Sequence, residues 1–144
     1  MSGHDVVDAG EWQKPLPGPD AVSEPYWKAA AEGKLLIQSC PSCGKKQFYP
    51  RALCTQCGGD PEWYEASGSG TVHTFTVVRQ MGMRAFREEL PYVVAMVELD
   101  EGPMMMGNVT DCDPEAVSIG MPVEVHFVRV DDDTGIPYWR PART

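Results

Sequence analysis

From about residue 70 onward, apolar and turn-forming residues follow one another in a pattern typical of β-strands. Residues 71–80 are rich in β-branched and aromatic side chains, and residues 92–99 are almost continuously apolar, as expected for a strand covered on both faces. The turn sequence DEGP at 100–103 predicts that residues 104–110 form a strand antiparallel to the preceding one.

Two further strands are predicted after a short helical segment. Residues 113–120 can form one or two helical turns capped by Asp113. Residues 121–130 then alternate between apolar and polar, and a turn leads to a last strand at 136–141. The inward-facing positions expected for the alternating strand are Val123, Val125 and Phe127, with Val130 as a further candidate. Three strands, a short helix and two strands is the order of the OB barrel, so we predict a mainly β fold with a five-stranded OB-fold barrel over residues 67–141.

The N-terminal part of the chain shows a different pattern. Residues 1–22 contain four prolines or glycines in KPLPGPD and little that could form a core, which predicts an extended or mobile arm. Residues 23–38 begin with a short helix, which Ser23 is expected to cap and Gly33 to end in the left-handed conformation. This helix carries a small aromatic face that should pack against the next module, formed by Tyr26, Trp27 and Ala30.

Four of the five cysteines lie between this helix and the first barrel strand, in two Cys-x-x-Cys pairs separated by ten residues. They are Cys40, Cys43, Cys54 and Cys57. Each pair is followed by a glycine, at Gly44 and Gly58, where the backbone can turn back and direct N–H groups at sulfur. Four thiolates at this spacing can surround one ion as a tetrahedron, and a closed shell of four leaves no position for a substrate.

We therefore predict a rubredoxin-like zinc ribbon over residues 39–66, with one structural Zn²⁺ per chain. The alternatives are a pair of disulfides, a redox-active Cys-x-x-Cys, or an iron centre of the same geometry. Elemental analysis separates these possibilities.

Composition limits the partners and the location of the protein. Lys and Arg number 12 against 21 Asp and Glu, which gives a formal net charge of −9. A nucleic-acid binder needs a basic surface to displace counterions from phosphates, so this charge disfavours that class. The N-terminal residues show neither a membrane span nor a secretory signal, so we expect a cytoplasmic protein that does not enter membranes.

The sequence offers poor material for catalysis. A nucleophilic thiol or hydroxyl needs a base within reach. The unpaired Cys112 lies between Asp111 and Asp113, whose negative charges disfavour its thiolate. The three histidines are scattered along the chain, at His4, His73 and His126. We predict no catalytic residue in this chain.

One loop is chemically distinctive. Residues 79–92 join the first two predicted barrel strands and so belong to the ligand-binding face of an OB barrel. They combine arginines with soft apolar side chains, namely Arg79, Met81, Arg84, Phe86 and Arg87. This mixture is typical of a surface that contacts something anionic and partly apolar, or another protein. The alternative is an amphipathic turn that covers the barrel end. Arg51, beside the second cysteine pair, is a further candidate for a phosphate contact or a simple surface charge.

These segments resemble the small zinc-ribbon and OB-fold proteins of the "domain of unknown function 35" type, which accompany thiolases and thiolase-like aldolases. The resemblance covers residues 23–141. It rests on EPYWKAAAEGKLLIQSC, the CPSCG and YPRALCTQCG ribbon sequences, GSGTVHTFTVV, LPYVVAMVELDEGP and IGMPVEVHF, in that order.

The resemblance implies a non-catalytic accessory subunit that forms a hetero-oligomer with a thiolase-fold catalytic subunit, needed for activity on acyl-CoA, and that helps to enclose the CoA moiety. The partner would carry out carbon–carbon cleavage, by thiolysis or by retro-aldol reaction, on a fatty, aromatic or steroid acyl-CoA. Some members of the family are fused to a hydratase-like domain, which makes a hydratase-like protein a candidate third component. The contacts assigned above to the loop and to Arg51 come from their chemistry and not from the resemblance.

A single-stranded nucleic-acid binder is the competing function, since zinc ribbons and OB barrels both serve that role. Fold alone does not separate the two classes. Stacking aromatics in such a protein accompany a basic track, which the aromatic residues of this acidic chain lack.

Overall fold

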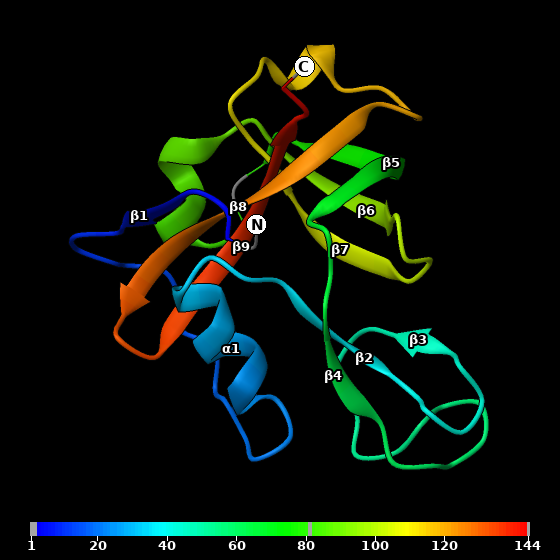
Figure 1. Cartoon of the computed structure of the whole chain (residues 1–144). Helices are drawn as coiled ribbons and strands as arrows, with labels where there is room; N and C mark the ends of the chain where they lie inside the picture. Colours follow the sequence, from blue (N-terminus) through cyan, green and yellow to red (C-terminus); the bar gives the residue numbers. More distant parts are fainter. Residues whose placement is uncertain (1–2, 81, 144) are drawn as a thin grey trace.

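A computed structural model of the chain describes residues 3–80 and 82–143 and contains a β-barrel, a small ribbon and a helix beside them (Figure 1). The barrel strands are β5 (Ser69–Val78), β6 (Tyr92–Leu99), β7 (Met104–Val109), β8 (Pro122–Asp131) and β9 (Thr134–Pro141). The sheet runs β5-β6-β7-β9 and closes because β8 pairs with both β9 and β5. This is the OB arrangement, so the predicted fold class is confirmed.

The barrel closes at a short seam between β7 and β9. These two strands are parallel and share a single registered pair, Val109 with Trp139. The Thr110 N–H also donates to the Trp139 carbonyl over 2.7 Å. The neighbouring β6–β7 pair is instead in register from Val93 to Glu98.

Alternation along the strands builds the core. Every second side chain of β6 is buried, at Val93, Ala95, Val97 and Leu99. Of the predicted inward residues of β8, Val123, Val125 and Phe127 are buried, whereas Val130 is only half-buried. Trp139 of β9 joins them and is 0% exposed. The outer face of β6 is only half-buried, although its nearly continuous apolar sequence predicted cover on both faces.

Two 3₁₀ segments connect the barrel strands. The first, η1 (Arg84–Glu89), lies between β5 and β6, inside the loop that the sequence analysis singled out. The second, η2 (Pro114–Ala116), lies between β7 and β8. Its predicted cap is confirmed, because the Asp113 carboxylate accepts a hydrogen bond from the Glu115 N–H over 2.9 Å.

The ribbon precedes the barrel and joins it directly. Its strands are β2 (Leu36–Ser39), β3 (Lys46–Gln47) and β4 (Glu62–Glu65), in the order β3-β2-β4. After β4 the Ala66 N–H donates to the Leu35 carbonyl over 2.8 Å, and the chain then enters β5. Figure 1 shows the ribbon set to one side of the barrel, with β4 leading into β5.

The helix α1 (Glu24–Ala31) packs on the barrel near its final strand. Gly33 ends it with φ +82°, as predicted. Ser23 occupies the N-cap position, as predicted, but its side chain makes no bond to the first helical turn and instead accepts from the Asp20 N–H over 3.2 Å. At Gly135 of β9 an added Cβ would lie 2.3 Å from the carbonyl carbon of Ala30, so the helix backbone lies directly against this glycine. No helix in the described part of the chain has the length and apolar character needed to cross a membrane.

The N-terminal segment runs extended along the barrel and includes a strand that the sequence pattern did not predict. This strand, β1 (Val6–Asp8), pairs in parallel with β8. The Phe127 N–H donates to the Asp5 carbonyl over 2.9 Å, and the Asp5 carboxylate accepts from Arg140 over 2.7 Å. Backbone pairing with β8 and these charge contacts hold β1 in place, and a strand of three residues is too short to be recognised from its own sequence pattern.

Candidate metal centre and aromatic groove

The two cysteine pairs form matching turns. In the first, the Gly44 N–H donates to the Cys40 carbonyl over 2.7 Å, and in the second the Gly58 N–H donates to the Cys54 carbonyl over 3.0 Å. Gly44 and Gly58 have φ of +78° and +76°, the left-handed conformation that lets the backbone turn back at these positions, as predicted. Each turn brings its two thiols to the same side of the backbone.

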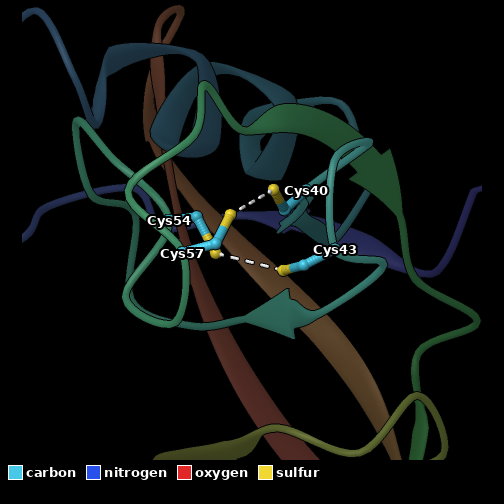
Figure 2. A group of neighbouring side chains, drawn as sticks. All are labelled: Cys40, Cys43, Cys54 and Cys57. Carbon is cyan, nitrogen blue, oxygen red and sulfur yellow. Dashed lines mark hydrogen bonds between the residues drawn. The ribbon is translucent and has the colours of Figure 1, made fainter.

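The four sulfur atoms converge on one point (Figure 2). The Sγ atoms of Cys40 and Cys57 are 3.5 Å apart, those of Cys43 and Cys54 are 3.6 Å apart, and all four lie within 4.8 Å of one another. A tetrahedron with Zn–S bonds near 2.3 Å has edges of about 3.8 Å, so the sulfurs fit around one such ion. The cysteines are free thiols in the structure, and their spacing suits coordination of one metal ion.

Backbone amides favour an ionised sulfur in the second pair. The N–H groups of Cys57 and Gln56 lower the pKa of Cys54 to about 6. For Cys57 the Gly59 N–H acts in the same direction, but the neighbouring thiols of Cys40 and Cys43 raise its pKa to about 12. Four crowded thiols therefore do not all ionise unless a cation compensates their charge.

Two buried glutamines fix the second cysteine turn, and the sequence analysis missed them. The Gln38 amide donates to the carbonyl of Arg51 over 2.9 Å and accepts from its N–H over 2.8 Å. The Gln47 amide donates to Gln38 over 2.8 Å and accepts from the Thr55 N–H over 2.9 Å. Gln38 lies on β2 and Gln47 on β3, so these bonds tie the second turn to the ribbon sheet. A glutamine in a short strand carries no sequence signal for this role.

We expect Gln47→Leu to weaken metal binding about ten-fold, because hydrogen-bonded partners of metal-binding segments typically contribute at this level. The substitution leaves all four thiols in place but frees the Thr55 N–H. Competition with a chromogenic chelator measures the affinity. Gln80→Leu, at an exposed position outside the ribbon, is the control. Equal affinities in the two variants would contradict the role of Gln47.

An apolar groove of about 520 Å³ lies where helix, ribbon and barrel meet. Its walls carry six aromatic residues, which are Tyr26, Trp27, Phe48, Tyr49, Phe86 and Tyr92. Met105 to Asn108 of β7 and Ile136 and Pro137 of β9 also line it. We call this the aromatic groove. No lining residue among those described carries a charge.

The aromatic wall on the helix and ribbon side consists of rings in edge-to-face and tilted contact. The ring of Tyr26 lies 4.8 Å from that of Trp27, 5.5 Å from that of Phe48 and 5.9 Å from that of Tyr49. Tyr26 is 2% exposed, and its burial raises its pKa. The predicted packing of the helical aromatic face on the next module is thus confirmed, and this packing holds the wall rigid.

The loop residues proposed from the sequence take different positions. Phe86 lines the aromatic groove and lies 5.9 Å from the ring of Tyr92. Arg79 forms an ion pair with Glu115, outside the groove. Arg84 and Arg87 are exposed on η1, and neither lines the groove. Met81 lies outside the described residues. Arg51 is exposed in the ribbon, where its backbone contacts Gln38.

Lys14 of the N-terminal segment holds η1 against the barrel. Its Nζ is 2.5 Å from a carboxylate oxygen of Glu89 and 3.4 Å from the hydroxyl of Tyr138. The same ammonium lies 5.0 Å from the ring centre of Trp12 and 5.4 Å from that of Phe86. Burial opposes the charge, but the contacts with Glu89 and Tyr138 outweigh it and raise the pKa of Lys14. Lys14 thus connects the N-terminal segment to a wall of the groove.

Lys14→Met should loosen η1 while the barrel stays folded. The change removes the ion pair with Glu89 and the cation–π contact with Phe86, and we expect amide exchange in residues 84–89 to accelerate about ten-fold. Hydrogen-exchange mass spectrometry measures this. Lys45→Met, at an exposed ribbon position, is the matched variant and should leave the segment unchanged. Unaltered exchange in the Lys14 variant would show that η1 is held by other contacts.

Cys112, His73 and His126 belong to neither the cysteine cluster nor the aromatic groove. Burial, together with the charges of Asp111 and Asp113, raises the pKa of Cys112, which agrees with its predicted inertness. His126 faces Thr110, with 2.9 Å between Nε2 and Oγ1, and burial lowers its pKa. His73 is exposed, at the point where the register of β5 against β6 shifts.

Comparison with known proteins agrees with this arrangement. Residues 27–63 match the rubredoxin-like zinc ribbon domain of ChsH2, and residues 63–128 match the C-terminal OB-fold domain of ChsH2. A "DUF35 domain-containing scaffold protein" from Methanocaldococcus jannaschii is 39% identical over 74% of this chain and 77% of its own length.

Two further relatives come from larger assemblies or longer proteins. A "probable enoyl-CoA hydratase alpha subunit" from Thermomonospora curvata is 35% identical over 90% of this chain, which spans only 40% of that protein. A chain in a solved structure of the Ltp2-ChsH2(DUF35) aldolase superposes with a TM-score of 0.79 at 34% identity, over 89% of this chain and 100% of the other. With its zinc-ribbon and OB-fold domains in the same order, the chain belongs to the DUF35 family.

Proposed function

We propose that this chain is a non-catalytic accessory subunit of a thiolase-superfamily enzyme, in which it helps to bind and position acyl-CoA for carbon–carbon bond cleavage. The observation that carries the proposal is the aromatic groove, a ligand-sized apolar hollow on a chain similar to one in the Ltp2-ChsH2(DUF35) aldolase. The catalytic groups would come from a thiolase-fold partner in a hetero-oligomer. Its reaction would be thiolysis or retro-aldol cleavage of a fatty, aromatic or steroid acyl-CoA.

The chemistry of the chain supports a positioning role. The pKa of Cys112 is raised, and the four remaining thiols converge on one metal position, so no thiol is prepared for attack on a thioester. A groove that orients the substrate and excludes water assists a reaction through geometry alone. The net charge of −9 argues against the competing role in nucleic-acid binding.

We further propose that Cys40, Cys43, Cys54 and Cys57 bind one Zn²⁺ per chain, in a structural role. The sulfur spacing fits a tetrahedral shell, and four protein ligands leave no coordination position for water or substrate. The ion would hold the ribbon turns together. Phe48, which follows β3, and its neighbour Tyr49 would thereby be held in the groove wall.

Co-purification tests the accessory role. We expect the tagged chain to capture a thiolase-fold protein in a stable complex that buries more than about 1,000 Å². The rate of carbon–carbon cleavage of acyl-CoA by that protein should fall when the chain is omitted and recover when the chain is added back. A chain that binds oligonucleotides and no thiolase-fold protein would contradict the proposal.

Residues of the 79–92 loop and of the ribbon are candidate contacts with the partner or with CoA, namely Arg79, Met81, Arg84, Phe86, Arg87 and Arg51. We expect Arg84→Glu to weaken assembly or to raise the substrate KM about ten-fold, because the exposed arginine would lose a charge-assisted contact and gain a repulsive one. Analytical ultracentrifugation of the complex and steady-state kinetics measure these effects. Lys45→Glu makes the same charge change at an exposed ribbon turn and should have neither effect.

A further inference from the structure

We propose that the aromatic groove binds the acyl group of acyl-CoA, a neutral and ring-containing one, while the phosphates of CoA lie outside the groove. This inference rests on the proposed function, and it assigns different places to the acyl group and to the CoA phosphates. It differs from the expectation that this chain mainly encloses the CoA moiety. The argument comes from the charge, the shape and the rigidity of the groove.

The charge of the groove excludes the phosphates. Phosphate groups are bound in proteins by arginine, by lysine, or by clusters of backbone N–H groups at helix ends. Among the described residues, none that lines the groove carries a positive charge, and the walls are formed by strand and aromatic side chains. Arg79 is already engaged by Glu115, and the exposed Arg84 and Arg51 are absent from the lining. An anion placed in the groove would lose its hydration without gaining a cation.

The size of the groove suits one small apolar group. A volume of about 520 Å³ lies within the range of pockets that take a single small ligand. It is too confined for the broad surface that a second folded protein needs. The opening lets the rest of a long ligand continue outward, as a thioester carrying CoA would require.

The walls favour a flat ring over a flexible chain. Tyr49 contacts Tyr26 and Phe48 edge to face, Tyr26 and Phe48 meet at a tilt, and Phe86 and Tyr92 pack together in another part of the lining. Side chains held in this way lose little conformational entropy when a ring binds between them. Met105 and Met106 supply adaptable contacts in the floor. These features together select an apolar acyl group with at least one ring.

A titration series on the metal-loaded chain tests the inference. The probes are CoA, acetyl-CoA, phenylacetyl-CoA and the phenylacetyl thioester of pantetheine, which lacks the phosphates, and calorimetry measures each affinity. We expect phenylacetyl-CoA and its pantetheine counterpart to bind equally well and both to bind at least ten-fold more tightly than acetyl-CoA. Raising the salt concentration should have little effect, since no phosphate contact is involved.

A matched pair of charge substitutions locates the binding. Met106→Glu puts a carboxylate in the floor, at a side chain that is 65% exposed and therefore tolerant of the change, and should weaken phenylacetyl-CoA binding about ten-fold. Ile119→Glu makes the same change at another exposed apolar position outside the lining and should leave the affinity unchanged. Circular dichroism confirms that both variants are folded.

Three results would overturn the inference. If CoA alone binds as tightly as its esters, with strong salt dependence, the phosphates and not the acyl group carry the affinity. If Met106→Glu binds like the wild-type chain, the acyl group lies elsewhere. If no ester binds to the chain or to its complex with a thiolase-fold partner, the groove has another occupant. Co-purification distinguishes failure of this inference from failure of the proposed function. The accessory role is contradicted only if the chain also captures no thiolase-fold protein.

Discussion

Replacing Cys40 with serine is expected to release the metal ion, unfold the ribbon and remove one wall of the aromatic groove. Cys40 is 1% exposed, and its Sγ lies 3.5 Å from that of Cys57, so a hydroxyl there leaves three thiols around the position of the ion. Apparent binding free energies of structural zinc in small folded units are on the order of 10 kcal/mol, which exceeds what three short strands gain by pairing alone. Phe48 and Tyr49 depend on these strands and should lose their fixed positions.

Elemental analysis and hydrogen exchange measure the two parts of this result. The variant should lose its metal, and amides in residues 36–65 should exchange much faster, while the barrel strands β5 to β9 keep their slow exchange. Cys112→Ser removes a thiol outside the cluster and should change neither quantity. An ordered ribbon in the metal-free variant would contradict the structural role of the ion. Detection of iron in the wild-type protein would contradict the proposal that the ion is zinc.

Replacing Gly135 with alanine is expected to destabilise the protein by about 3 kcal/mol, at the upper end of the range for overpacked positions. The new methyl group would lie 2.3 Å from the carbonyl carbon of Ala30 and 2.5 Å from its oxygen. These are backbone atoms of α1, so a rotamer change cannot relieve the clash. The helix must move away from β9, and this movement also displaces Tyr26 and Trp27 from the groove wall.

Thermal denaturation followed by circular dichroism tests this expectation. A loss of this size lowers the melting temperature by roughly 10 °C in a chain of this length. Gly18→Ala is the control, because no atom lies within 4 Å of the position of its Cβ. A Gly135→Ala variant as stable as this control would mean that the helix is not seated on β9 as described.

The parts of the fold that follow a repeating pattern were predictable. Alternation in residues 121–130 identified the buried face of β8, and the spacing of the four cysteines identified the ribbon. Asp113 marked the start of η2, and Gly33 marked the end of α1. Each of these signals is local, so the sequence alone contains it.

The parts that sequence reasoning missed depend on contacts between distant residues. β1 exists because its backbone pairs with β8, about 120 residues later, and its three residues are too few to form a strand pattern of their own. Lys14 looks like an ordinary surface lysine until Glu89 and Tyr138 are placed around it. The sequence named Phe86 as a candidate contact because of its loop, and Phe86 lines the aromatic groove, but the groove itself is formed by helix, ribbon and barrel together.

The short seam of the barrel lies in the floor of the groove. Met105 to Asn108 belong to β7, and Ile136 and Pro137 belong to β9, so the lining spans the two strands that share a single registered pair. Where so few backbone bonds join neighbouring strands, transient opening costs the least free energy. A molecule resting across this junction would hold both strands and suppress the opening, and at a hundred times its dissociation constant it would add about 2.7 kcal/mol to the free energy of unfolding. Occupancy and the mechanical integrity of the barrel are thus coupled, and a rise in melting temperature reports on both.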